Sequence, residues 1–170
     1  EFELSADAEI TLECAPGQLA DETFHELLRL GMNRISFGVQ SFVDKESAAV
    51  GRLHTRDECL REIARVKAAG VRDVSLDLIA GLPFQTEASW RSSVRQAIAS
   101  GVEHVSVYML EVDEDSRLGR EVMRRGTKYH AAAVPSDDLA AEWYQLACEE
   151  FEAAGIGQYE ISNFTREGHR

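Results

Sequence analysis

The stretch GVRDVSLDLIAGLP, residues 70–83, contains the pattern that decides the fold. A glycine closes an amphipathic helical segment, a short apolar strand follows at once, and the strand ends at a second glycine. Glycine after a helix permits the positive φ that finishes the helix, and the next apolar residue can pack back on its last turn. The order helix, glycine, strand indicates one unit of an α/β fold.

The same unit occurs four times, with the other copies turning at Gly31, Gly101 and Gly155. Helix starts are marked by capping residues at Asp21, Thr55, Thr86 and Ser136. Short, mostly apolar strands are predicted at Glu9–Cys14, Arg34–Val39, Asp73–Ile79 and His104–Leu110. Strands that alternate with helices at this period predict a parallel sheet with right-handed crossovers, either open or closed into a barrel.

A polar residue marks the carboxyl end of each predicted strand. These residues are Glu13, Gln40, Asp77 and Glu111. In a closed or partly closed barrel such ends converge on one mouth, so side chains from different strands can contact one ligand. Polar residues are also ordinary where strands meet solvent. Asp77 fits that second explanation least, because an unpaired carboxylate inside an apolar strand is costly, and we expect it to have a partner or a ligand.

The segment Gly51 to His54 joins two short helical stretches. Arg52 could hold a carboxylate with two hydrogen bonds or point into water, and its own surroundings in the sequence favour water. His54 is interpreted as a local structural residue. The acidic run Glu111–Asp115 lacks the glycine and the twelfth-position glutamate of a calcium loop, so it is expected to be solvated, and no metal site is predicted.

Composition limits the class of protein. The chain has 170 residues, 44% of them hydrophobic, and a formal charge of −12, which makes nucleic acid and anionic membrane surfaces poor partners. Membrane contact is expected only through a partner protein. No apolar run approaches the roughly 20 residues of a membrane span. Three widely spaced cysteines, at Cys14, Cys59 and Cys148, suggest reduced thiols in the cytoplasm.

Five blocks, read in order, resemble the HemW and coproporphyrinogen III dehydrogenase family of radical S-adenosylmethionine (SAM) proteins. The blocks are ITLECAPG (10–17), RISFGVQSF (34–42), GRLH (51–54), SLDLIAGLP (75–83) and QYEISNF (158–164). The resemblance implies part of a (β/α)6 TIM-like barrel that binds SAM beside a [4Fe–4S] cluster. The CxxxCxxC loop and the HNxxYW motif of the family are absent from these residues, so we expect an internal piece of a longer protein.

The resemblance also implies roles for particular positions. Glu13, Gln40, Arg52 and Asp77 match SAM contacts, with the two carboxylates serving charged or hydroxyl groups and the arginine a carboxylate. Residues 1–135 would form the central and C-terminal part of the barrel. Residues 136–170 would form a helix and strand that lead into the C-terminal region of the family. The cluster ligands would lie outside the chain, which alone is expected to be inactive.

Three functions stay open at this point. The first is a HemW-type chaperone that binds haem and delivers it to acceptor proteins. The second is an oxygen-independent coproporphyrinogen III dehydrogenase, which decarboxylates propionates by radical chemistry. The third is an α/β module that binds a metabolite without radical chemistry. The form of Tyr108–Asp113 and the QYEISNF block favour the first.

Overall fold

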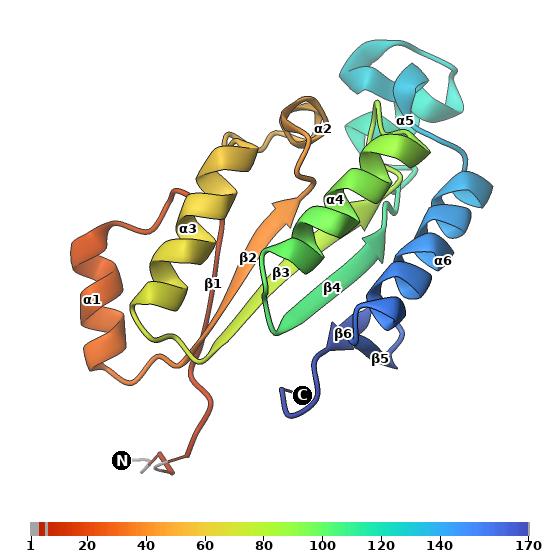
Figure 1. Ribbon diagram of the computed structural model, residues 1–170. Coiled ribbons are helices and arrows are strands. Elements are labelled where there is room, and N and C mark those ends of the chain that lie inside the picture. Colours follow the sequence, from red (N-terminus) through yellow and green to blue (C-terminus); the bar gives the residue numbers. More distant parts are fainter. Residues whose placement is uncertain (1–3, 6, 170) are drawn as a thin grey trace.

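Six strands form one sheet in the order β1-β2-β3-β4-β6-β5, in a computed structural model that describes residues 4–5 and 7–169 (Figure 1). The strands are β1 Thr11–Cys14, β2 Arg34–Gln40, β3 Asp73–Ala80, β4 His104–Met109, β5 Gly157–Glu160 and β6 Asn163–Thr165. The helices are α1 Asp21–Arg29, α2 Asp44–Ala49, α3 Arg56–Ala68, α4 Glu87–Ala99, α5 Arg117–Met123, the 3-10 helix η1 Lys128–Ala133 and α6 Asp137–Ala153.

The first four strands run parallel to one another, as the repeat predicts. Their bounds agree with the predicted bounds to within two residues. At the carboxyl end of the chain the strand pairing changes from parallel to antiparallel. There the QYEISNF block forms a hairpin, and its second strand, β6, pairs antiparallel with both β4 and β5. The turn between β5 and β6 is too short for a helical crossover, so the chain must reverse direction.

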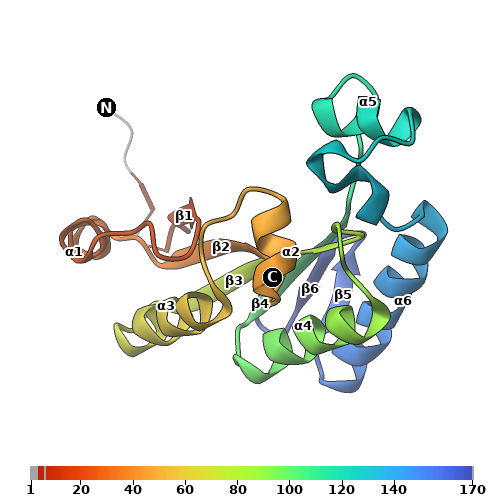
Figure 2. The same ribbon diagram turned by 90° about the horizontal axis from the view of Figure 1, so that it is seen from above.

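The four longer helices, α1, α3, α4 and α6, cover one side of the curved sheet (Figure 2). Buried strand residues such as Ile35, Leu76 and Val105 pack against them in the hydrophobic core. The indole nitrogen of Trp90 on α4 donates to the backbone carbonyl of Trp143 on α6 over 2.6 Å. These contacts fix the helices on one face, and the opposite face is called the inner face below.

The helix starts follow the predicted capping residues with one exception. Thr55 forms a capping box with Glu58, and the hydroxyls of Thr86 and Ser136 accept from the backbone of the first turn. Asp21 was predicted to cap α1, but Ala20 precedes the helix and Asp21 lies in its first turn. There its carboxylate pairs with Arg65 of α3. Tertiary pairing thus replaces local capping at this position.

Helices α5 and η1 form an excursion at the carboxyl ends of the strands, and the sequence did not predict them (Figure 1). The 3-10 helix contacts the loop after β3, where the backbone nitrogen of Phe84 donates to the carbonyl oxygen of Ala133. None of the helices within residues 4–5 and 7–169 is long and apolar enough to span a bilayer.

Candidate functional site

The inner face of the sheet is polar. Side chains alternate between the two faces of a strand, so residues that neighbour the core positions of β2, β3 and β4 point away from the helices. The residues placed there by this alternation are Arg34, Ser36, Ser75, Asp77, His104 and Ser106. The register puts Ser36, Ser75 and His104 side by side across three strands. Polar groups of several strands are therefore collected on one surface.

Gln40 and Arg52 lie together above Gly38 of β2. A Cβ atom on Gly38 would stand 3.0 Å from Gln40 Nε2 and 3.7 Å from Arg52 Nη2. The absence of a side chain at Gly38 thus lets both groups approach the strand. The Arg52 guanidinium therefore lies over the sheet and is only partly exposed. Its role as a SAM contact, implied by the family resemblance, stays a prediction.

Asp77 lies on the same face, one strand further along. Burial raises the pKa of the Asp77 carboxyl above its usual range, and the negative charge of Glu13 acts in the same direction. A hydrogen bond with the Ser106 hydroxyl and the positive charges of Arg34 and Arg52 lower it in part. The expectation that Asp77 has a partner or a ligand stays a prediction. Two carboxyls and two guanidinium groups therefore act on one another here.

Glu13 reaches this cluster from the edge strand β1. It pairs in register with Ser36 of β2, and Ser36 pairs with Ser75, two residues before Asp77. Glu13 itself is exposed, in contrast to the buried Gln40. The structure thus brings Glu13, Gln40, Arg52 and Asp77 to the carboxyl half of one face, and the arrangement can receive a ligand with donor groups and a carboxylate.

Glu111, the fourth polar residue predicted at a strand end, does not join this cluster. It is exposed beyond the end of β4 and lines a hollow of about 740 Å³ that also includes Met123 and Pro135. His54 is buried, and its Nε2 lies 3.0 Å from the carbonyl oxygen of Val39. That contact agrees with the structural role predicted for His54.

A buried polar network supports the loops after β2 and β3. Glu46 of α2 is only 1% exposed, and its Oε2 accepts from the Ser41 hydroxyl over 2.6 Å and from Gln85 Nε2 over 3.5 Å. Gln85 Oε1 in turn accepts from the backbone nitrogen of Gly81 over 2.6 Å. Gln40 has a φ of 68° at the start of the first loop. The network holds both loops in place around that strained residue.

Sequence reasoning missed three inner-face residues that contact the cluster or flank it. Ser106 pairs in register with Asp77, and His104 Nδ1 lies 2.8 Å from the Ser75 hydroxyl. Burial, with the charge of Arg34, lowers the pKa of His104 to about 4. Serine and histidine inside an otherwise apolar strand were the available signal, and they follow the same alternation as Asp77.

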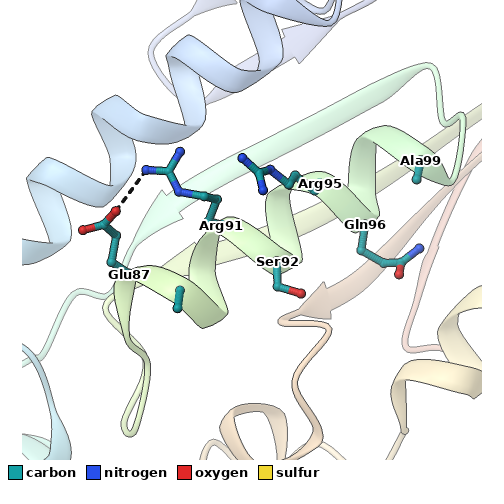
Figure 3. Close-up of a pocket in the computed structure, with 7 residues that line it drawn as sticks. Glu87, Arg91, Ser92, Arg95, Gln96 and Ala99 are labelled. Carbon is teal, nitrogen blue, oxygen red and sulfur yellow. Dashed lines mark hydrogen bonds and ion pairs between the residues drawn. The ribbon is translucent and has the colours of Figure 1, made fainter.

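A different hollow, of about 790 Å³, runs along the outer side of α4 (Figure 3). Arg91 and Arg95 point into it, but both guanidinium groups pair with Glu150 of α6, and Arg91 also pairs with Glu87. These ion pairs are partly exposed and contribute little to stability. The hollow lies on the helical side of the sheet, away from the cluster on the inner face.

The described part of the chain contains no group of three or more His, Cys, Asp or Glu residues that could hold a metal ion. All three cysteines are free thiols, and Cys59 is fully buried. Burial raises the pKa of Cys59 to about 12 and that of Cys14 to about 11. Neither of these two thiols is poised as a thiolate ligand in this structure.

A family model described as the radical SAM superfamily matches residues 2–97, more than half of the chain. This segment includes Glu13, Gln40, Arg52 and Asp77. The chain therefore belongs to the radical SAM superfamily, and the fold class predicted from the sequence is confirmed in its mostly parallel α/β form.

Among curated proteins, the chain is similar to the heme chaperone HemW of Synechocystis, at 36% identity over 98% of the chain. The Escherichia coli heme chaperone HemW is 34% identical over the same share. A mouse protein named radical S-adenosyl methionine domain-containing protein 1, mitochondrial, is 35% identical over 99%. The chain spans only 39%, 42% and 37% of the lengths of these proteins.

Among solved structures, the chain is similar to coproporphyrinogen III oxidase (HemN) from Escherichia coli, described as a radical SAM enzyme. The TM-score is 0.84 with 23% sequence identity, covering 99% of this chain and 38% of the other. The archaeal Elp3 of Methanocaldococcus infernus gives a TM-score of 0.62 over 86% of the chain. At these identities the structural matches show a shared fold.

Proposed function

We propose that this chain is an internal segment of a HemW-type radical SAM protein. The full-length protein would bind haem and deliver it to acceptor proteins. The observation that carries the proposal is the identity of 34–36% with heme chaperones over almost the whole chain. The structural similarity to HemN supports the fold but stands at 23% identity. Sequence identity therefore favours the chaperone over the decarboxylase.

We propose SAM as the ligand of the inner-face cluster. Asp77 and Glu13 accept hydrogen bonds from the ribose hydroxyls or the α-amino group, which the negative charge of both side chains favours. The Arg52 guanidinium holds the SAM carboxylate, and the Gln40 amide beside it fixes the approach over Gly38. With a [4Fe–4S] cluster held by residues outside the chain, the cofactor supplies radical chemistry.

We propose that haem binds at the carboxyl end of β4, separately from the SAM-binding side chains Glu13, Gln40, Arg52 and Asp77. A hollow of about 440 Å³ is lined there by apolar and aromatic side chains, including Tyr108, Met109, Tyr144 and Ile161. Ile161 is 82% exposed and Met109 47% exposed, although both are apolar. Such a surface suits a flat, apolar macrocycle. Replacement of Ile161 by glutamate should weaken haem binding and leave the affinity for SAM unchanged.

The full-length protein with its cluster reconstituted provides the test. Haem binding is followed by the Soret band, transfer by the appearance of haem in an acceptor apoprotein, and decarboxylation by product analysis with coproporphyrinogen III. Stable haem binding with transfer supports the proposal. Turnover of coproporphyrinogen III would replace it with the dehydrogenase function, and a protein that binds neither haem nor SAM would point to the module without radical chemistry.

Two further expectations from the sequence are proposals at this stage. We propose that the protein works in the cytoplasm, which its three free thiols support. We also propose that residues 1–135 belong to the barrel and that residues 136–170 lead toward the C-terminal region of the family. Limited proteolysis of the full-length protein between Val134 and Ser136, with stable products on both sides, would support that boundary.

A further inference from the structure

A second hollow adjoins the proposed haem surface at the end of β4. It measures about 740 Å³ and is formed by the loop after β4, helix α5 and the start of α6. Met109 lines both this hollow and the smaller one of about 440 Å³ that includes Tyr108 and Ile161. Met123 of α5 lines the larger hollow as well and is 66% exposed. The two hollows therefore meet at Met109 and offer a largely apolar surface.

Helix α5 lies over this hollow because its first turn packs directly on the acidic loop after β4. The Ser116 hydroxyl accepts from the backbone nitrogen of Gly119 over 2.9 Å and so starts the helix. A Cβ atom on Gly119 would collide with the backbone oxygen of Asp113, so the close approach requires glycine. Figure 2 shows this excursion on the side of the sheet away from α3 and α4. Val122 and Met123 of the helix then line the hollow.

The segment 117–128 is basic in a chain that is otherwise acidic. Five of its residues are basic and only Glu121 is acidic, whereas the whole chain has 30 acidic and 18 basic residues. All five are exposed, and none forms an ion pair with another residue of the described part of the chain. Such groups beside an apolar hollow suit an apolar ligand that carries carboxylates. The five basic residues are Arg117, Arg120, Arg124, Arg125 and Lys128.

Arg120 and Arg124 begin at the rim of the hollow. Each directly follows a residue that lines it, Gly119 or Met123, and one step along an α-helix is a rotation of roughly 100°. The two side chains therefore leave the helix beside the lining face. Arg120 Nη1 also donates to the backbone carbonyl of Asp115, which holds its guanidinium next to the loop that forms the hollow. Four further N–H groups of that guanidinium can still bind a ligand.

We propose that Arg120 and Arg124 bind the propionate carboxylates of haem, whose macrocycle lies on the apolar surface at Met109. This inference rests on the proposed function as a haem-binding protein. Haem is a flat, apolar ring with two carboxylates at one edge, and the surface is an apolar hollow with arginines along one rim. The propionate edge of the ring then faces α5, and the opposite edge faces Ile161.

Two carboxylates of the same hollow act against a negatively charged ligand. Glu111 and Glu114 line its loop side, and both are exposed. Their repulsion of a propionate is screened by solvent but not removed. Glu114 lines only the larger of the two hollows, so removal of its charge reports on the propionate end of the surface. Neutral substitutions of the arginines and of Glu114 should therefore change haem affinity in opposite directions.

The test titrates haem into the full-length protein and follows the Soret band. The double variant Arg120→Gln with Arg124→Gln should bind haem about tenfold more weakly, because it loses two exposed ion pairs worth about threefold each. Glu114→Gln should bind haem about threefold more tightly. The control Arg29→Gln makes the same change of charge on α1, at the other end of the sheet, and should leave the affinity unchanged (Figure 1).

Haem dimethyl ester, in which both propionates are esterified, isolates the contribution of the carboxylates. Its affinity should be the same for the wild type, the double arginine variant and Glu114→Gln. Equal haem affinity in the wild type and the double variant overturns the inference, and so does an equal loss of affinity for haem and for the ester. Vesicles of phosphatidylserine test a membrane surface instead. Loss of vesicle binding with unchanged haem affinity would assign the arginines to that surface and overturn the inference.

A single variant and the wild type complete the design. Arg124→Gln alone keeps the contact of Arg120 with Asp115, and it should weaken haem binding by about threefold even if the double variant does not fold. A wild-type protein that binds no haem would overturn the proposed function itself. A wild-type protein that binds and transfers haem, with arginine variants that bind haem equally well, overturns only the role of the arginines.

Discussion

Gly38 lacks the Cβ atom that would stand 3.0 Å from Nε2 of Gln40. This relationship between two residues of one strand keeps the amide, and the Arg52 guanidinium beside it, close to the backbone of β2. The close approach is possible because glycine has no side chain, and it places both polar groups on the inner face of the sheet.

The first prediction follows from that approach. Gly38→Ala should displace the Gln40 amide and weaken the binding of S-adenosylhomocysteine by about tenfold, the equivalent of one hydrogen bond. Stability should change little, because the displaced atoms are the ends of flexible side chains. Gly157→Ala is the matched control, since an added Cβ there meets nothing within 4 Å. Calorimetric titration of both variants checks this, and equal affinities would contradict it.

The second prediction concerns backbone strain at Gln40, whose φ is 68°. Residues with a Cβ pay about 1 kcal/mol or more in this left-handed region, and glycine does not. Gln40→Gly and Gln40→Ala both remove the amide, so both should bind S-adenosylhomocysteine weakly. Urea unfolding should show the glycine variant to be the more stable by about 1 kcal/mol. An alanine variant of equal or greater stability would show that the strain is absent.

A third prediction tests the network beneath the two loops. Glu46→Ala leaves the Ser41 hydroxyl and the Gln85 amide without their acceptor inside the protein, and the free energy of unfolding should fall by about 2 kcal/mol or more. Glu46→Gln keeps an acceptor oxygen and should lose less than half as much. Chemical denaturation of the two variants measures the difference. Equal losses would mean that the network is not what stabilises this region.

The fourth prediction is a pH dependence of stability caused by His104. Its pKa is about 4 in the folded chain and near 6.5 when unperturbed, so the unfolded state binds the extra proton between these values. The stabilisation is complete above about pH 6.5 and is lost as the pH falls toward 4, by up to about 3 kcal/mol. His104→Gln does not titrate here, so the difference in unfolding free energy between wild type and variant should narrow over this range. Parallel stability curves would refute the assignment.

Many helix and strand boundaries depend on residues that are close together in the sequence. Thr55, Thr86 and Ser136 start their helices because a side-chain oxygen a few atoms away satisfies the first free backbone nitrogens. Glycines such as Gly70, with a φ of 84°, finish helices because they tolerate that conformation. These signals act within one turn, and they placed the first four strands and most of the helices. Asp21 shows the limit, since a distant arginine decides its role.

The sequence predicted only some of the residues that come together at the candidate site. The sequence identified three of the site residues, because each is polar and lies at the end of an apolar strand, and parallel strands bring such ends together. These residues are Glu13, Gln40 and Asp77. Arg52 was ambiguous, because nothing near it in the sequence says that Gly38 leaves room for its guanidinium. The resemblance to a family supplied that assignment, which stays a prediction.

The sequence by itself determined the α/β class, the order of the units and the polar residues available to the inner face. Only the tertiary structure decided that the last block turns back as a hairpin and that Asn163 meets Ser106, 57 residues earlier in the chain. The physical reason is the separation along the chain of the groups that interact. Capping and turn formation depend on atoms a few bonds apart, whereas strand pairing and hydrogen bonds between strands depend on the register of segments that only the packed chain brings together.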